Sequence, residues 1–251
     1  MSHSDLSIPL LVHAHYTLDS EDLPFWLSLA QAKGGPILEL GCGTGRVLLQ
    51  LAQAGFAAIG LDHDRAMLIF LQGKFPAGME GCLHLVQADL AAFHFGCRFP
   101  LIYLPCNTLS TLHRAARKAL FARVAEHLAP GGVFAASIPN PEWLADLPAL
   151  GEEELEETLV HPESGNPVQI SSSWERWAGT FQLCWHYDHL LPDGQVERIT
   201  LETTHDLARL EDYQAALEGA GLVVEATYGD FDRSEYSAES PNLILVTRKP
   251  G

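Results

Sequence analysis

An apolar segment that runs directly into three alternating glycines constrains this chain more than any other feature. Residues 37–40 are apolar apart from Glu39, and Gly41, Gly43 and Gly45 precede an amphipathic segment over residues 46–54. Glycine has no Cβ, so the backbone can turn sharply here and approach a bound ligand closely. The pattern predicts a β-strand, a ligand-binding turn and an α-helix, although a glycine-rich turn without a ligand would have the same sequence.

The alternation of short apolar runs and helical periodicity continues through most of the chain, which predicts a mostly parallel sheet with helices on both faces. The expected strands are residues 37–40, 57–61, 83–87, 101–105, 133–138, 222–228 and 242–248. The expected helices are residues 22–32, 46–54, 65–73, 114–128 and 210–220. A Pro130-Gly131-Gly132 turn is expected before the fifth strand.

Residues 152–206 have a different pattern, in which period-two segments rich in Trp, Thr, Ile and Val replace helical periodicity. Such alternation predicts antiparallel strands. Pro192-Asp193-Gly194 is a hairpin signal, and residues 178–180 indicate a second hairpin. We therefore expect one α/β domain made of residues 1–151 and 207–251, with residues 152–206 inserted as an antiparallel β lid. Along residues 181–187 the odd positions form an aromatic and apolar row, which the sequence alone assigns neither to the core nor to a pocket.

Charge and composition exclude several classes of function. The formal net charge of −17 disfavours a nucleic-acid partner, because binding to phosphates requires clustered Lys and Arg. The five cysteines lack zinc-ligand spacing, and no apolar stretch is long enough for a membrane helix. We expect a cytoplasmic protein with reduced thiols, no metal site and no membrane association.

The glycine spacing separates two kinds of nucleotide cofactor. A dinucleotide-binding turn has a further glycine at its sixth position, where this chain has Arg46. Asp62 and Asp89 end the second and third expected strands, and a carboxylate such as Asp62 can accept hydrogen bonds from ribose hydroxyls. Either Asp62 or Asp64 could instead cap the following helix, and Asp64 is better placed to do so.

Glu39 with Gly41-Cys42-Gly43-Thr44-Gly45, together with Asp62, Asp89 and the Pro130-Gly131-Gly132 turn, resembles the class I S-adenosylmethionine-dependent methyltransferases. The resemblance covers residues 35–141 and implies a Rossmann-like seven-stranded sheet with S-adenosyl-L-methionine at the carboxyl ends of its strands. The cofactor-binding residues that it suggests are Tyr16, Glu39, Gly41, Cys42, Gly43, Gly45, Asp62, His63, Met67, Asp89, Leu90 and Pro105.

Residues 15–19, 22–26 and 228–232 resemble a bacterial group of these enzymes that acts on small molecules and carries an inserted antiparallel sheet. This narrower resemblance implies N- or O-methylation of a small acceptor by in-line methyl transfer. It suggests Tyr16, His113 and Tyr228 as residues near the reacting methyl group. Alignment of the reactants is expected to contribute more to the rate than a strong general base.

Two other functions would use the same fold. Base-amine and glutamine methyltransferases commonly have an (Asn/Asp)-Pro-Pro-aromatic motif after the fourth strand, where this chain has Leu104-Pro105-Cys106-Asn107. That difference and the acidic charge disfavour a nucleic-acid or protein substrate. A non-catalytic S-adenosylmethionine-binding protein with a regulatory or assembly role is the remaining alternative, and the sequence does not indicate an oligomeric state.

Overall fold

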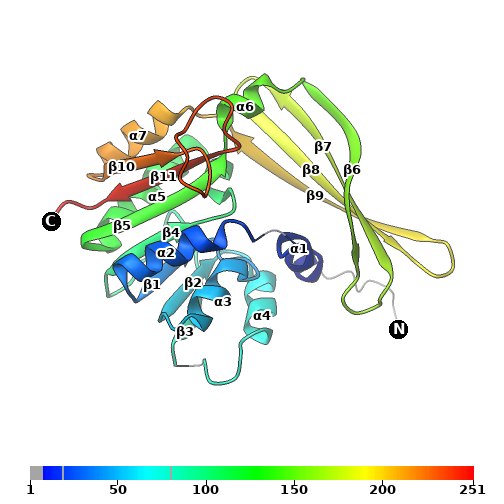
Figure 1. The fold of residues 1–251 in the computed structure, drawn as a ribbon, viewed down its shortest axis with the longest axis horizontal. Helices are drawn as coiled ribbons and strands as arrows, with labels where there is room; N and C mark the ends of the chain where they lie inside the picture. Colours follow the sequence, from blue (N-terminus) through cyan, green and yellow to red (C-terminus); the bar gives the residue numbers. More distant parts are fainter. Residues whose placement is uncertain (1–7, 19, 80) are drawn as a thin grey trace.

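The computed structural model describes residues 8–18, 20–79 and 81–251. Its centre is a seven-stranded sheet with the order β10-β11-β5-β4-β1-β2-β3, in which β11 runs antiparallel to both of its neighbours (Figure 1). The strands are β1 (Ile37–Leu40), β2 (Ala58–Asp62), β3 (Leu83–Gln87), β4 (Phe99–Leu104), β5 (Leu128–Pro139), β10 (Val223–Tyr228) and β11 (Asn242–Arg248). The Rossmann-like seven-stranded sheet that the sequence predicts is confirmed.

Alternate strand residues are buried against helices on opposite faces of this sheet. Leu38 and Leu40 belong to a cluster that includes residues of α5 and α7, whereas Ile37 belongs to a cluster that includes residues of α2, α3 and α4. The helices are α2 (Leu23–Lys33), α3 (Arg46–Gln53), α4 (Arg65–Gly73), α5 (Arg114–His127) and α7 (Leu210–Gly219). Burial on both faces explains why the strands are apolar runs rather than alternating ones.

Three elements were not expected from the sequence, namely α1 (Ile8–Tyr16), η1 (Thr108–Thr111) and α6 (Pro141–Asp146). The two short ones offer too few residues for a periodic pattern, and α1 lies in a segment for which the sequence predicts no element. The expected turn at Pro130-Gly131-Gly132 is also different, because β5 begins at Leu128 and includes it. Pairing of Leu128 with Phe99, followed by a register shift, holds this segment in the sheet.

The segment between α6 and α7 folds into a separate four-stranded antiparallel sheet, as predicted. Its strands are β6 (Leu150–Val160), β7 (Pro167–Trp177), β8 (Thr180–Leu190) and β9 (Val196–Asp206), paired in sequence order. Gly179 and Gly194 have φ values of 77° and 86° in the two predicted hairpins, where a residue with a Cβ would be strained. Among the described residues, no helix is both long and apolar enough to cross a bilayer.

Helix α1 lies between the two sheets (Figure 1). Leu11 packs in a third apolar cluster with Val168, Ile170 and Tyr187 of the four-stranded sheet. The His15 Nδ1 atom lies 2.9 Å from the Tyr187 hydroxyl. The predicted row on β8 is therefore divided, because Tyr187 is buried under α1 while Trp185 is half-buried beside the His15 ring.

A second connection joins β9 to η1 through His205 and Ser110, whose Nδ1 and Oγ atoms are 2.8 Å apart. Burial lowers the pKa of the His205 imidazole to about 4. Burial also lowers the pKa values of His13 and His15 on α1. The histidines between the two sheets are thus neutral at physiological pH. Their protonation at acidic pH would destabilise the interface between the two sheets.

A substitution at Gly60 on β2 would test how closely the glycine turn packs on the sheet. A Cβ at this position would collide with the Leu48 side chain and the Cys42 sulfur atom. We expect Gly60→Ala to lower the free energy of unfolding by about 1–3 kcal/mol through overpacking, measured by urea denaturation. The control is Gly219→Ala in α7, where a Cβ meets nothing within 4 Å and helix propensity favours alanine. Equal effects of the two substitutions would contradict the packing described here.

The lowered pKa of His205 also predicts that the stability of the fold depends on pH. The unfolded chain binds a proton on this imidazole below about pH 6.5, whereas the folded chain does so only below about pH 4. Stability therefore falls as the pH decreases from 6.5 to 4, and this one group contributes a loss of about 2 kcal/mol at pH 5. Urea denaturation at pH 7.5, 6 and 5 should show a smaller loss for His205→Phe than for the unsubstituted protein, and parallel curves would contradict the assignment.

Candidate active site

The glycine turn after β1 adopts a backbone that glycine alone accepts without strain. Gly41, Gly43 and Gly45 have φ values of 62°, 49° and 83°, all in the left-handed region. A Cβ at Gly45 would collide with Leu71, so α3 and α4 pack closely at this point. A Cβ at Gly43 would meet nothing within 4 Å, which leaves open space directly above the turn.

Asp62 fixes this turn from the end of β2. One carboxylate oxygen accepts a hydrogen bond from the Gly43 amide at 2.7 Å, and the other accepts from the Asp64 amide at 2.8 Å. Asp64, in turn, caps α4 by accepting from the Ala66 amide at 2.7 Å. The capping alternative therefore applies to Asp64, and each oxygen of Asp62 retains one lone pair for a ligand.

The remaining candidates on this side follow β2 and β3. The Ala88 amide donates to the Asp62 carbonyl at 3.0 Å and so holds the ends of the two strands together. Asp89 accepts from the Ala91 amide at 2.7 Å, which fixes its side chain in a local turn. Three further candidates lie nearby in the chain: His63 is exposed beside Asp62, Met67 is partly buried in the first turn of α4, and Leu90 is buried.

Glu39 is a buried carboxyl group whose Oε2 atom has no hydrogen-bond partner among the described residues. Its register partner on β4 is Tyr103, whose buried hydroxyl interacts with the Glu39 carboxyl group but does not reach ordinary hydrogen-bond geometry. Burial raises the pKa of Glu39 to about 8. A buried carboxyl oxygen without a good partner is costly, and its place beside the glycine turn fits a site that a polar ligand completes.

The turn after β4 carries backbone strain. Cys106 and Asn107, which follow Pro105, have φ values of 59° and 65°, in a region that residues with a Cβ rarely adopt. Cys106 as a whole is exposed, but desolvation of its sulfur atom raises the pKa of the thiol to about 11 despite the adjacent Arg46, so the thiol is neutral. Consecutive strained residues are typical of functional sites, and sequence analysis gave no signal for them.

Arg46 connects this turn to the beginning of α2. Its guanidinium binds the Asp22 carboxylate through both terminal nitrogens, one of them at 2.6 Å, and also lies 3.0 Å from the Cys106 sulfur. Asp22 accepts a further hydrogen bond from the buried Trp26 indole at 2.9 Å. The residue that distinguishes this turn from a dinucleotide-binding turn thus anchors three segments around the site.

Helix α1 covers the glycine turn. The His13 Nδ1 atom lies 3.1 Å from the Thr44 hydroxyl, within the turn itself. Tyr16 ends the helix and stacks on His15, with ring centroids 5.1 Å apart. Tyr16 is 43% exposed, and desolvation of its hydroxyl together with the nearby Cys106 raises the pKa of that group.

The other two candidates for a catalytic role each have a local contact of their own. His113 is exposed and caps α5, where its Nδ1 atom accepts from the Ala116 amide at 3.3 Å. Tyr228 packs its ring against Phe25, with centroids 6.3 Å apart. Among the described residues, no hydrogen bond or ring contact joins Tyr16, His113 and Tyr228, so the structure does not assemble them into one group.

The described residues that come together as possible metal ligands also have other roles. His94, Glu126 and His127 form such a group, but the His127 ring bonds the Arg123 carbonyl at 2.7 Å and the Phe95 amide at 2.9 Å. Both of its nitrogens are therefore engaged within the fold. The His13-Ala14-His15 pair has ligand-like spacing, yet the two rings bond to Thr44 and Tyr187 respectively.

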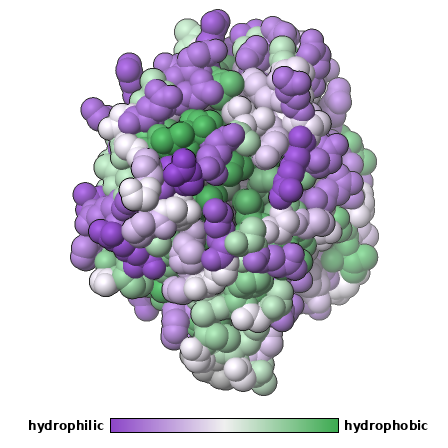
Figure 2. Space-filling view, turned by 60° about the vertical axis from the view of Figure 1, so that its left-hand side comes forward, coloured by the Kyte–Doolittle hydropathy of each residue, from purple (hydrophilic) through white to green (hydrophobic). Residues whose placement is uncertain are grey.

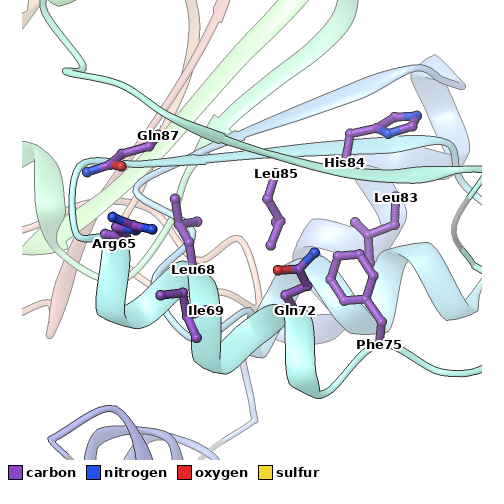
Figure 3. Close-up of a pocket in the computed structure, with 9 residues that line it drawn as sticks. All are labelled: Arg65, Leu68, Ile69, Gln72, Phe75, Leu83, His84, Leu85 and Gln87. Carbon is purple, nitrogen blue, oxygen red and sulfur yellow. The ribbon is translucent and has the colours of Figure 1, made fainter.

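A cavity of about 430 Å³ lies between α4 and β3. Figure 3 shows that its lining side chains come from these two elements and the loop after α4, at the outer edge of the sheet. None of the glycines of the turn lines it, and Gln87 at one end is bonded to the His63 carbonyl. Figure 2 shows a face on which polar side chains surround small apolar patches. The candidate site is therefore defined by the carboxyl edge of the sheet rather than by this cavity.

Comparison with known proteins identifies relatives of this chain. A family model described as a methyltransferase domain matches residues 37–132, which include the glycine turn and the ends of β2, β3 and β4. The putative methyltransferase YqeM of Bacillus subtilis is 26% identical over 249 residues, covering 96% of this chain and 93% of that protein. Trans-aconitate 2-methyltransferase of Acidovorax ebreus is 34% identical over 200 residues, covering 74% of each chain.

Solved structures show the same fold. An S-adenosylmethionine-dependent methyltransferase from Clostridium acetobutylicum matches with a TM-score of 0.78 at 16% identity, covering 92% of each chain. The sugar N-methyltransferase KedS8 from a Streptoalloteichus species matches with a TM-score of 0.76 at 21% identity, covering 100% of this chain and 96% of that one. This chain belongs to the class I S-adenosylmethionine-dependent methyltransferases, and S-adenosylmethionine is its cofactor.

Proposed function

We propose that this enzyme methylates a small molecule, at nitrogen or oxygen, in a space between the glycine turn and the four-stranded sheet. The observation that carries the proposal is the position of α1, which bonds to the turn through His13 and to the sheet through His15. A helix that contacts both the glycine turn and the four-stranded sheet limits the size of the space above the turn. The formal net charge of −17 further disfavours a nucleic-acid acceptor.

We propose that the units built on the two sheets have different functions. Residues 1–151 and 207–251 would bind the cofactor, and residues 152–206 would cover the acceptor as a lid. In support, β6 to β9 form a separate sheet, and its contacts with η1 and α1 lie at the carboxyl edge of the main sheet.

Within the first unit, Asp62 would receive the ribose hydroxyls on its free lone pairs, and Gly43 would leave room for the ligand backbone. Glu39 would accept from the positively charged part of the cofactor, since a nearby cation favours the ionised carboxylate. Asp89, His63, Met67 and Leu90 would surround the adenine at the ends of β2 and β3. The floor of the cofactor site would be formed by Gly41, Cys42, Gly45 and Pro105.

S-adenosylmethionine supplies a methyl group that is already activated by a positively charged sulfur. The residues of this chain then need to align the acceptor and exclude water. Tyr16 is the strongest of the three catalytic candidates, because it ends α1, the helix that bonds to the glycine turn through His13. His113 and Tyr228 are weaker candidates, since each has a local packing or capping role.

The identity of the acceptor is suggested by relatives of two kinds. One relative from Streptomyces fradiae is named dTDP-3-amino-3,6-dideoxy-alpha-D-glucopyranose N,N-dimethyltransferase, and it is 29% identical over 224 residues. Another acts, by its name, on trans-aconitate. An acceptor panel should therefore contain both amino sugars and small polycarboxylates.

The cofactor assignment predicts specific losses of affinity for S-adenosylhomocysteine, measured by calorimetry. Asp62→Ala should weaken binding by roughly ten- to a hundredfold, the effect of losing a buried hydrogen-bonded carboxylate of about 1–3 kcal/mol. Gly43→Val should abolish measurable binding by filling the open space above the turn. Its control is Gly131→Val, which has the same left-handed backbone and equally open surroundings on β5. Binding of NADH in preference, or unchanged affinity in both site variants, would contradict the assignment.

The acceptor assignment predicts release of S-adenosylhomocysteine with at least one member of the panel. Removal of the ring in Tyr16→Ala should reduce turnover more than Tyr16→Phe, because the ring covers the site while the hydroxyl takes no proton. His113→Ala should cost no more than the 10²–10⁴-fold that is typical of general acid–base catalysis. Turnover with tRNA or DNA, and with no small molecule, would contradict the proposal.

A further inference from the structure

One buried histidine of the four-stranded sheet lies beside the loop that follows β4. His205 on β9 is 5% exposed, and its Nδ1 atom lies 2.8 Å from the Oγ atom of Ser110, which is 3% exposed. Two positions on the same face of β9, Ile199 and Leu201, hold apolar side chains, and Thr203 lies between them and His205. An imidazole here costs desolvation that an apolar residue would avoid.

The hydrogen bonds of Ser110 determine which nitrogen of His205 carries the proton. A serine hydroxyl has one proton, and the Ser110 hydroxyl donates it to the Asn107 carbonyl at 2.7 Å. The same oxygen must therefore accept from His205, so Nδ1 is the protonated nitrogen. The Nε2 atom then keeps its lone pair.

That lone pair is not used within the fold. Nε2 has no hydrogen-bond partner among the described residues, and it is not completely sealed from solvent although His205 is only 5% exposed. Burial lowers the pKa of the ring to about 4, so Nε2 is a neutral hydrogen-bond acceptor at physiological pH.

The contact with Ser110 brings the His205 ring to the cofactor side of the molecule. Ser110 lies in η1, which begins at Thr108, and a Cβ on Gly41 would lie 3.2 Å from the Thr108 methyl group. Asn107, which receives the Ser110 proton, is one of the two strained residues of the turn. The chain of contacts from Gly41 to His205 therefore stays within one short helical turn.

We propose that His205 orients the methyl acceptor by accepting a hydrogen bond from its reacting N–H or O–H group on Nε2. This role rests on the proposed function, a small acceptor bound under the four-stranded sheet. The hydrogen bond aims the lone pair of the acceptor at the methyl carbon. As the new C–N or C–O bond forms, the C–S bond breaks and its electron pair remains on sulfur, which becomes neutral. The positive charge passes to the acceptor, whose extra proton leaves to solvent.

His189 provides a matched control on the same sheet. It is also buried, and its Nε2 atom lies 2.9 Å from the Ser164 hydroxyl. It stacks on His161, with ring centroids 4.6 Å apart, near the hairpin that joins β6 to β7. Loss of this ring changes the packing of the sheet without touching η1.

The first test is the tautomer of His205, read by ¹⁵N NMR of the S-adenosylhomocysteine complex at pH 7.5. We expect the proton on Nδ1 in the unsubstituted protein and a mixture of tautomers in Ser110→Ala. A proton on Nε2 would overturn the proposal, because that nitrogen could not then accept a hydrogen bond.

The second test compares turnover of the amino-sugar acceptor that the protein methylates best, because its reacting nitrogen carries an N–H group, and methylation of carboxylates alone would overturn the proposal. His205→Phe should lower kcat/KM by roughly ten- to a hundredfold, with affinity for S-adenosylhomocysteine unchanged, as expected for one lost hydrogen bond. His205→Gln should recover part of the activity, since its amide oxygen can accept, and His189→Phe should be fully active.

The outcomes separate this proposal from the one on which it rests. Full activity of His205→Phe, or equal losses in His205→Phe and His189→Phe, would show that His205 only packs the sheet. A protein that binds S-adenosylhomocysteine but methylates no small acceptor would instead contradict the proposed function, and with it any role of His205 in transfer.

Discussion

The carboxylate of Asp62 is the contact on which the geometry of the carboxyl edge depends. It accepts from the Gly43 amide on one oxygen and from the Asp64 amide on the other, so a single side chain fixes both the glycine turn and the start of α4. The turn needs such an anchor because three left-handed glycines have little conformational preference of their own. Charge-assisted hydrogen bonds to backbone amides provide that order, and they leave the carboxylate with further acceptor capacity toward a ligand.

The second sheet depends on that edge through a small number of polar contacts. His15, His205 and Arg117 reach across, to Tyr187, Ser110 and Asp206 respectively. Neutral histidines suit this interface, because each can accept or donate one hydrogen bond without the desolvation penalty of a buried charge. Because these histidines are buried in the neutral form, their protonation would weaken the interface at acidic pH. Separation of the two sheets and loss of global stability are therefore expected to follow the same protonation events.

The seven strands and the inserted sheet could be predicted because their signals are local and repeated. Strand β1, the glycine turn and α3 follow from one run of residues, and β3 and β11 have the predicted bounds, because flanking turns mark their ends. Helix α1 could not be predicted, since its buried residues Leu10 and Leu11 are adjacent rather than spaced by a helical period. Its stability as a helix comes from packing between the two sheets, which no local pattern encodes.

The residues of the candidate site also fall into those that the sequence could predict and those that it could not. Gly41, Gly43 and Asp62 could be predicted because their spacing is fixed by the strand-turn-helix unit. The pairs His13–Thr44, Arg46–Asp22 and Ser110–His205 could not, since their partners are separated by 31, 24 and 95 residues in the chain. For His113 the reverse holds, because its place after the fourth strand suggested a role in catalysis while its ring caps α5.

Several groups that reduce stability lie at the carboxyl edge of the main sheet or on the strand that faces it. Glu39 and Tyr103 are buried without full hydrogen bonding, Cys106 and Asn107 have left-handed backbones, and His205 of β9 is buried with one nitrogen that has no partner among the described residues. Two further buried nitrogens without a partner, on His161 and His189, lie in the four-stranded sheet near its β6–β7 hairpin, and Arg233 is also left-handed. Local departures of this kind persist where the surrounding structure is stable enough to hold them. Those at the carboxyl edge support the proposal that the acceptor binds there, because they surround the glycine turn.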